Sequence, residues 1–333
     1  MTERVSPSLS TAVLFIGFKR FEASKAVLEA IRAARPARFY FACDGPRPDQ
    51  PGEAEAVAKV RSLVELVDWP CEFHMLFSVT NKSVRSGPPA AIDWFFQHEE
   101  EGIILEDDCL PMPTWFRFAE ELLERYRHDQ RVWVIMGNNL MTEWPATNDK
   151  SYYSSPHGYG AYWGWASWRR TWNLYDLEMA QWPEFRDSGA LDGHFLSNSE
   201  RAEAFSVFEN SWNGKIHSWD FQLDFGRWMQ GAVNLIPTVN LIRNIGFGET
   251  STHTGSDLDP RNKEDSSDIK FPLNHPLSLL VDNRRDLAYF ERYIEPSTFR
   301  LIKNFVKNAL PDSIDKAVTP FLGDLQRKYG LPG

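Results

Sequence analysis

The stretch Gly102–Tyr126, GIILEDDCLPMPTWFRFAEELLERY, decides the fold class of this 333-residue sequence. It begins with a short apolar run, which is typical of a strand buried on both faces, and then places three carboxylates in a row at 106–108. Apolar residues at helical spacing then predict a helix over Thr114–Arg127. Acidic residues often cap the start of a helix, but Pro111 and Pro113 separate the carboxylates from this one. The stretch therefore predicts a strand, an acidic loop and a helix.

The first 140 residues repeat this alternation of strand and helix patterns. The predicted strands are Thr11–Gly17, Arg38–Cys43, Glu72–Phe77, Gly102–Leu105 and Val132–Met136. The predicted helices are Glu22–Ala34, Glu53–Val67, Pro88–His98 and Thr114–Arg127. Strands and helices that alternate with short connections predict an α/β protein with a Rossmann-like, mostly parallel central sheet and helices on both faces.

Regular periodicity is lost after about residue 140. Nine of the 13 Trp residues lie between Trp144 and Trp228, among Gly, Ser, Asn and Tyr. We expect residues 141–255 to form a loop-rich, Trp-rich half of the same domain, packed on the sheet of residues 1–140. Residues 256–333 are expected to form a polar loop and a helical tail that covers the core. Because the tail is basic and amphipathic, peripheral contact with an anionic membrane is the alternative.

Composition excludes several classes of protein. The formal net charge of -10 argues against a nucleic-acid-binding coat, which needs a basic surface. The apolar run Ala12–Phe18 is much shorter than the ~20 residues that span a bilayer. Three cysteines (Cys43, Cys71 and Cys109) stand far apart, so we expect neither a disulfide framework nor a cysteine zinc site. These features predict a cytoplasmic protein.

The acidic triplet Glu106, Asp107 and Asp108 is the strongest chemical signal. It follows a strand directly, and α/β sheets bind ligands at the carboxyl ends of their strands. Adjacent carboxylates repel one another unless a cation offsets their charge. Mn²⁺ or Mg²⁺ typically takes one or two carboxylates together with phosphate oxygens of a substrate. The triplet therefore predicts a divalent-metal site for a phosphorylated ligand.

Four further residues are candidates for contacts with that ligand. Arg20 follows the first predicted strand, and Asp44 ends the second. Lys82 and Arg85 follow the third. A nucleotide contact and an ordinary surface or turn role remain open for each of them.

Trp219-Asp220 lies inside a predicted helical segment that runs to Met229, and Asp220 is a candidate general base. A carboxylate beside a Trp is partly desolvated, which raises its pKa toward a useful range. A simple acidic residue at the helix start is the alternative. His253 is a candidate metal ligand or phosphate contact, although a lone His is more often structural. Trp163, Trp165 and Trp219 could stack on a sugar ring, while core packing is the commoner use of such side chains.

Several motifs together resemble the bacterial GT-A nucleotide-sugar glycosyltransferases, whose distant relatives are the eukaryotic alpha-mannoside beta-1,2-N-acetylglucosaminyltransferase I enzymes. The motifs are the quoted GIILEDD stretch, GNN, GYGAYWGWASWRRTW, SWDFQ and NIGFG followed by THT, over roughly residues 11–254. The resemblance implies a GT-A fold, a nucleotide-diphosphate sugar donor and a divalent metal, with Mn²⁺ favoured over Mg²⁺. It also implies inversion at the anomeric carbon.

The same resemblance implies roles for single residues. Arg20 would contact the donor nucleotide, and Asp44 its base. Glu106, Asp107 and Asp108 match the EDD form of the DXD motif, in which the last Asp ligates the metal and the others hold ribose, sugar and metal-bound water.

The later motifs supply the remaining roles. Asp220 would be the catalytic base, although the animal enzymes have a second acidic residue where this chain has Phe221. His253 would lie near the metal or the diphosphate.

The expected function is transfer of a sugar from a nucleotide-diphosphate sugar, with a UDP-sugar favoured, to a hydroxyl of a glycan or glycoconjugate. Residues 1–140 would bind the donor, and residues 141–255 the acceptor. Two alternatives stay open. One is a sugar-nucleotide pyrophosphorylase, and the other is a non-catalytic carbohydrate-binding protein on a transferase fold. The donor sugar, the acceptor and the oligomeric state are not specified by these motifs.

Overall fold

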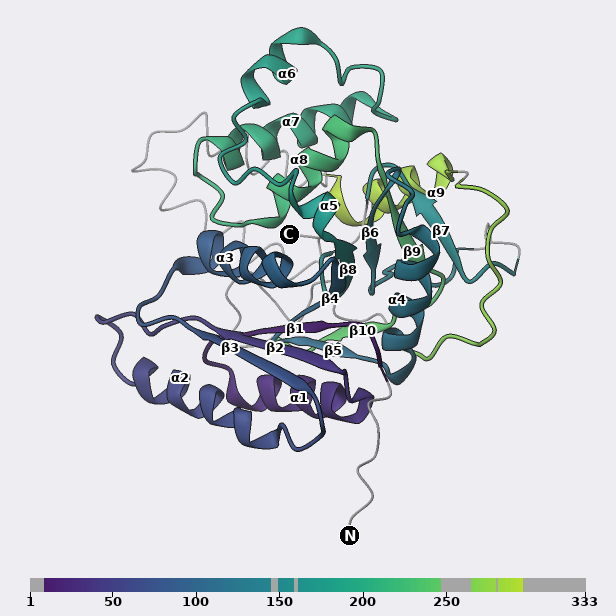
Figure 1. Ribbon diagram of the computed structural model, residues 1–333. Coiled ribbons are helices and arrows are strands. Elements are labelled where there is room, and N and C mark those ends of the chain that lie inside the picture. Colours follow the sequence, from purple (N-terminus) through teal and green to yellow (C-terminus); the bar gives the residue numbers. More distant parts are fainter. Residues whose placement is uncertain (1–8, 145–148, 159–160, 247–264, 280, 296–333) are drawn as a thin grey trace, which may run out of the picture. The chain divides into compact units, whose positions relative to one another are not determined.

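Eight strands form the central sheet of the protein, whose computed structural model describes residues 9–144, 149–158, 161–246, 265–279 and 281–295. The strands are β1 (Val13–Gly17), β2 (Arg38–Cys43), β3 (Glu72–Phe77), β4 (Glu101–Glu106), β6 (Val132–Met136), β7 (Tyr152–Ser155), β8 (Trp165–Trp168) and β9 (Val233–Pro237). Their order across the sheet is β3-β2-β1-β4-β8-β6-β9-β7 (Figure 1). Two short strands, β5 (Cys109–Pro111) and β10 (Ile242–Asn244), form a separate antiparallel pair.

Most strands of the sheet run in one direction. β3, β2, β1 and β4 are parallel neighbours. β8 is antiparallel to both β4 and β6, so β6 points the same way as β4, and β9 is parallel to β6. Only β7 and β8 run in the opposite direction. The predicted α/β fold with a mostly parallel central sheet is confirmed.

Helices cover both faces of this sheet. The helices among the described residues are α1 (Phe21–Ala34), α2 (Glu53–Ser62), α3 (Ser83–His98), α4 (Pro113–Tyr126), α5 (Arg169–Trp172), α6 (Trp182–Ser188), α7 (Asn198–Trp212), α8 (Asp220–Gln230) and α9 (Asn283–Tyr289). A 3₁₀ turn, Leu63–Leu66, continues α2, and a π-helical turn, Phe290–Ile294, follows α9.

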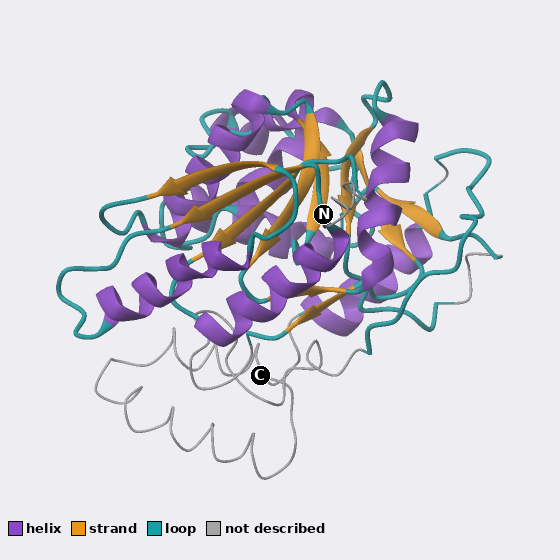
Figure 2. Cartoon of the chain, turned by 60° about the horizontal axis from the view of Figure 1, so that its bottom comes forward, coloured by secondary structure: helices purple, strands orange, loops and turns teal. Residues whose placement is uncertain are grey.

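Each face of the sheet has its own apolar cluster. On one face α1, α2 and α4 pack residues such as Ile31, Val60 and Leu122 against the strands. On the other face α3 and α8 contribute residues such as Phe95 and Leu223. Figure 1 shows α1 and α2 below strands β1–β3 and α3 above them, and Figure 2 shows the sheet from the side of α1 and α2. A third cluster joins α6, α7 and α8.

The Trp-rich half contributes strands to the sheet itself, which differs from the expectation of a loop-rich half packed upon it. β7, β8 and β9 all come from residues after 140, and β8 lies between β4 and β6. β8 is the four-residue segment Trp-Ala-Ser-Trp, and all four residues are buried. A strand this short that is buried on both faces has no polar-apolar alternation, so periodicity does not distinguish it from a loop.

The chain up to Leu287 forms one compact unit, and the chain from Ala288 onward forms a second. Of the predicted polar loop only residues from 265 onward are described, and the predicted helical tail over 296–329 lies outside the described residues. Within the described part, no helix combines the length and the apolar character needed to cross a membrane.

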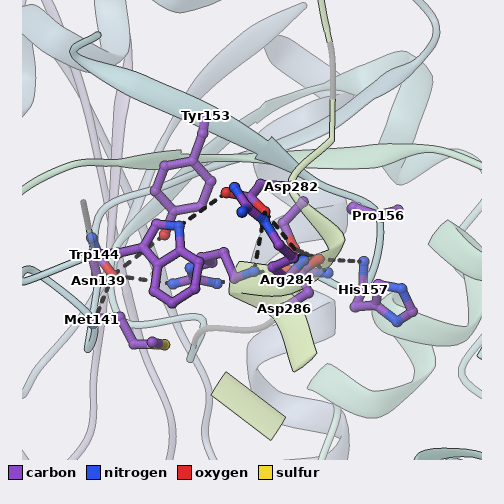
Figure 3. A network of polar contacts seen from close by, with 12 residues as sticks. Asn139, Met141, Trp144, Tyr153, Pro156, His157, Asp282, Arg284 and Asp286 are labelled. Atoms are coloured by element: carbon purple, nitrogen blue, oxygen red, sulfur yellow. Dashed lines mark hydrogen bonds and ion pairs between the residues drawn. The ribbon is translucent and has the colours of Figure 1, made fainter. Parts of the chain in front are cut away.

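A buried polar network ties the segment after β7 to the start of α9 (Figure 3). The side chains of Arg285 and Asp286 are fully buried and lie 3.4 Å apart. Asp286 accepts hydrogen bonds from the Ser155 hydroxyl (2.6 Å) and the His157 amide (3.3 Å), and Arg285 donates to Asn139 Oδ1 (3.1 Å). Each of these ionic groups therefore depends on polar partners that are distant in sequence.

We expect the substitution Asp286→Asn to lower the free energy of unfolding by about 3–5 kcal/mol, because it removes the carboxylate charge that lies 3.4 Å from the buried guanidinium of Arg285. Urea denaturation at pH 7 measures this change. Asp187→Asn is the matched control, because Asp187 is 68% exposed in its pair with Arg186 and should change stability little. Equal effects of the two substitutions would contradict the assignment.

Candidate active site

A cavity of about 930 Å³ lies at the carboxyl ends of β1, β2 and β4 and at the start of α8. Register explains why distant residues meet there. Ile16 pairs with Glu106, and Gly17 pairs with Cys43, so three parallel strands end at the same edge. Nine of the predicted site residues line the cavity: Arg20, Asp44, Lys82, Glu106, Asp107, Asp108, Trp163, Trp219 and Asp220.

Arg20 bridges two carboxylates of the acidic triplet. It lies at the N-cap of α1, in the three-residue connection that follows β1. Its Nη2 lies 2.8 Å from Asp107 Oδ1, and its Nη1 donates to Asp108 Oδ2 at 2.8 Å. Burial alone would lower the pKa of Arg20, but Asp107, Asp108 and Glu106 together raise it. The guanidinium is therefore the internal counter-charge of the triplet.

The triplet remains electrostatically strained despite Arg20. Burial, followed by repulsion from Asp108 and Asp107, raises the pKa of Glu106 to about 8. Burial also raises the pKa of Asp107, against the opposing effect of Arg20. The Oδ2 atom of Asp107 is buried and has no hydrogen-bond partner among the described residues. Additional positive charge at this edge would stabilise the ionised triplet.

The carboxylates suit a divalent cation that shares its coordination with a ligand. Among the described residues, no three His, Cys, Asp or Glu side chains are arranged to hold a metal on their own. The buried Oδ2 of Asp107 and the cavity-lining Asp108 nevertheless provide hard oxygen donors at one point. Mg²⁺-type ions usually take one or two carboxylates and complete their coordination with water and phosphate oxygens. The residues present fit such an ion.

Asp44 is engaged by the loop between β3 and α3. Its carboxylate accepts hydrogen bonds from the backbone amides of Lys82 (3.0 Å) and Gly45 (2.8 Å) and from Asn81 Nδ2 (2.9 Å). Burial raises the pKa of Asp44, while the Lys82 and Gly45 amides oppose that shift. Asp44 thus fixes the wall of the cavity that Lys82 lines.

A second ionic cluster, which the motifs did not reveal, supports the basic side of the cavity. Glu53, whose side chain is only 3% exposed, lies 2.8 Å from Lys19 Nζ and accepts a hydrogen bond from Arg47 Nε at 2.9 Å. Lys19 and Arg47 both line the cavity. Lys19 and Arg47 follow strand ends in the sequence, which is compatible with a place at the cavity. Their partner Glu53 lies on α2, so the sequence alone does not reveal the contact that orients them.

Asp220 is the first residue of α8, and its carboxylate accepts a hydrogen bond from Ser218 Oγ. The preceding Trp219 is buried, with its ring centroid 6.0 Å from those of Tyr162 and Trp165. The Tyr175 hydroxyl donates to the Trp219 carbonyl at 3.1 Å. This aromatic cluster fixes the start of α8 and thereby the position of Asp220.

Asp224, one helical turn after Asp220, contacts a residue of the cavity wall and was not indicated by the motifs. It accepts a hydrogen bond from the hydroxyl of the cavity-lining Tyr162 at 2.7 Å and lies 3.5 Å from Arg227. Burial raises its pKa to about 6, against the effects of Arg227 and Tyr162. The i, i+4 spacing from Asp220 was the only available clue.

Two other predicted residues, Arg85 and Trp165, do not line the cavity. Arg85 donates to the Leu177 carbonyl at 3.0 Å and lies 3.2 Å from Glu178, so it contacts the loop before α6. Trp165 is 1% exposed within β8 and packs in the core. His253 lies outside the described residues.

Comparisons with known proteins give only loose similarity. No protein-family model matches the chain, and no curated protein matches it. Among solved structures, the chain is similar to mannosyltransferase PcManGT from Pyrobaculum calidifontis in complex with GDP-Man and Mn²⁺, at 13% identity and a TM-score of 0.33 over 51% of this chain. The match spans about half of the PcManGT chain (47%).

Two other solved structures are similar at the same level. Mannose-1-phosphate geranyltransferase from Thermus thermophilus is 12% identical, with a TM-score of 0.33 over 68% of this chain and 73% of that chain. The glycosyltransferase GlyE in Streptococcus pneumoniae is 11% identical, with a TM-score of 0.26 over 61% of this chain and 44% of that chain. At these scores, a function for this chain rests on its own residues.

The ion-pair cluster around Glu53 predicts a pH dependence of stability. The hydrogen bond from Arg47 is the largest influence that lowers the pKa of Glu53 from its ordinary 4.5 to about 2. A lowered folded-state pKa contributes stability above the unfolded-state pKa, and this contribution is lost as the pH falls from about 4.5 to about 2.

We therefore expect Glu53→Gln to destabilise the protein most near neutral pH, with the difference from wild type shrinking below about pH 4.5. Urea midpoints measured across the range from neutral to acidic pH report this difference. Glu55→Gln, at an exposed position of the same helix, is the control. A difference that stays constant with pH would refute the ionic role of Glu53.

Proposed function

We propose that this chain is a metal-dependent glycosyltransferase of the GT-A type, which transfers a sugar from a nucleotide-diphosphate sugar to a hydroxyl of a glycan or glycoconjugate. A UDP-sugar is the favoured donor, and the anomeric configuration is inverted. The observation that carries the proposal is that the acidic triplet and Asp220 line one cavity at the carboxyl ends of parallel strands.

The donor would occupy the part of the cavity between the triplet and the loop after β3. Arg20, Lys19, Arg47 and Lys82 line this part and offer positive charge to a diphosphate. The cavity volume of about 930 Å³ lies within the range of small-molecule sites. Asp107 and Asp108 would hold a divalent ion, with Mn²⁺ favoured, against the diphosphate oxygens.

Transfer creates negative charge on the departing nucleoside diphosphate and requires removal of a proton from the acceptor. A divalent cation at Asp108, when bound, stabilises the charge that develops on the diphosphate. The oxygen of the acceptor hydroxyl attacks the anomeric carbon on the face opposite the leaving diphosphate, and Asp220 accepts the proton of that hydroxyl. Ser218 orients the Asp220 carboxylate, and the buried aromatic cluster around Trp219 fixes the start of its helix. Trp163 and Tyr162 line the cavity where the acceptor would enter.

The two alternative functions have less support from the described residues. A pyrophosphorylase needs a glycine-rich, basic loop after the first strand to hold a triphosphate. Here β1 ends at Gly17 and α1 begins at Phe21, with Phe18, Lys19 and Arg20 as the whole connection. A purely carbohydrate-binding role would not require the acidic triplet opposite Asp220.

We expect Asp220→Asn to lower kcat by about 10²–10⁴-fold with little change in the KM for the donor, because only proton removal is lost. Asp108→Ala and treatment of the wild type with EDTA should both abolish turnover. Release of the nucleoside diphosphate from a panel of UDP-, GDP- and TDP-sugars with Mn²⁺ measures the reaction. Asp187→Asn, a remote exposed carboxylate, should retain wild-type activity.

Undiminished turnover in Asp220→Asn would remove Asp220 from the mechanism, and undiminished turnover in EDTA would remove the metal. Formation of a nucleotide sugar and pyrophosphate from UTP and a sugar 1-phosphate would favour the pyrophosphorylase. Metal-dependent UDP binding without turnover of any donor would favour the binding protein.

A further inference from the structure

We propose that Arg20 is a displaceable counter-ion that competes with the divalent cation for Asp107 and Asp108, so that the metal and the nucleoside diphosphate bind cooperatively. This inference rests on the proposed function for the identity of the diphosphate ligand. The competition between Arg20 and the cation stands on the geometry of the site itself.

The guanidinium and a cation would share the same ligand atom. Arg20 Nη1 donates to Asp108 Oδ2, and Nη2 lies equally close to Asp107 Oδ1, both at 2.8 Å. An ion bound to Asp108 Oδ2 at a typical distance of about 2.1 Å would lie within about 5 Å of the guanidinium nitrogen. Two positive groups this close repel strongly in a partly buried site.

Backbone on the other side of the ion pair restricts how both groups could be accommodated. The Ile245 amide donates to the Asp108 carbonyl at 2.8 Å, which brings Gly246 against the pair. A Cβ atom at Gly246 would lie 2.4 Å from Asp108 Oδ2 and 2.5 Å from Arg20 Nη1. The backbone at Gly246 thus lies directly against the ion pair, and a side chain there would require Asp108 or Arg20 to move. Displacement of the guanidinium toward the cavity would free Asp107 Oδ1 and Asp108 Oδ2 for a cation.

The backbone of Arg20 is held by α1, whereas its side chain borders the open cavity. Its carbonyl accepts the first hydrogen bond of α1, from the Ser24 amide at 2.9 Å. Its side chain is 24% exposed and lines the cavity. The oxygens of a diphosphate give the guanidinium a new anionic partner, to which arginine binds in a bidentate geometry.

Cooperativity follows from this exchange of partners. Without a diphosphate, cation binding costs Arg20 its contacts with Asp107 and Asp108. With the diphosphate, Arg20 pairs with phosphate and leaves both carboxylates to the cation. Because linkage is reciprocal, the diphosphate raises the affinity for the metal by the same factor as the metal raises the affinity for the diphosphate.

The test measures binding of Mn²⁺ alone, by the EPR signal of free Mn²⁺, and then in the presence of saturating UDP. We expect Arg20→Gln to bind Mn²⁺ alone at least tenfold more tightly than wild type. UDP should tighten Mn²⁺ binding at least tenfold in wild type and less than threefold in Arg20→Gln. Arg20→Lys keeps the positive charge but loses the planar guanidinium that bridges the two carboxylates. We therefore expect it to bind Mn²⁺ alone two- to fivefold more tightly than wild type.

Lys19→Gln is the matched control, because it removes the same charge from the adjacent residue, whose partner is Glu53. It should bind Mn²⁺ alone within twofold of wild type. Thermal unfolding with and without Mn²⁺ checks folding, and Arg20→Lys keeps the test valid if Arg20→Gln does not fold.

Three outcomes would overturn the counter-ion role. The Arg20 variants could bind Mn²⁺ no more tightly than wild type, or Lys19→Gln could gain as much Mn²⁺ affinity as they do. The third outcome is that no Arg20 variant binds Mn²⁺ measurably. Tighter Mn²⁺ binding by Arg20→Gln in a protein that turns over no sugar nucleotide would instead support the counter-ion role and refute the proposed function.

Discussion

Three carboxylates at the end of one buried strand impose the main electrostatic constraint on this protein. β4 is fully apolar from Ile103 to Leu105, and its register with β1 places the acidic residues at the edge where the connection to α1 begins. Arg20 pairs with two of these carboxylates but carries a single positive charge. Burial, followed by repulsion from Asp108 and Asp107, raises the pKa of Glu106. The cations on the opposite wall and the helix that presents Asp220 are arranged around this acidic point.

The sheet and its acidic edge could be predicted because they depend on local sequence. The strands β1 to β4 are apolar runs bounded by helical patterns, and parallel strands must end together. Asp220 could be singled out for a similar reason, since a carboxylate beside a Trp is a local feature, and the structure places it at the same cavity. The residues that orient these groups depend instead on tertiary contacts. Glu53 and Asp224 are ordinary acidic residues of their helices until the fold brings Lys19 and Tyr162 to them.

The roles of the aromatic residues also depend on tertiary contacts that the sequence alone does not reveal. Their concentration after residue 140 suggested a sugar-binding surface, yet Trp165 lies in a core strand and Trp219 is buried beneath the start of α8. Composition reveals that rings are clustered, but only packing decides which of them face a ligand. Among the three predicted acceptor residues, Trp163 is the one that is partly exposed and lines the cavity. Arg85 was predicted to contact a phosphate because it follows a strand, but its guanidinium donates to the Leu177 carbonyl in the loop before α6.

The position of β8 has a consequence for how the chain can be divided. β4 and β6 are not hydrogen-bonded to each other, because β8 lies between them and joins both. A fragment that stops at residue 140 would expose the edge of β4 and leave β6 without any strand neighbour. The nascent chain must likewise emerge beyond Trp168 before the two parts of the sheet can be joined. The strands before residue 140 and those after it therefore belong to a single folding unit, and neither set can be exchanged as a module without dividing the sheet.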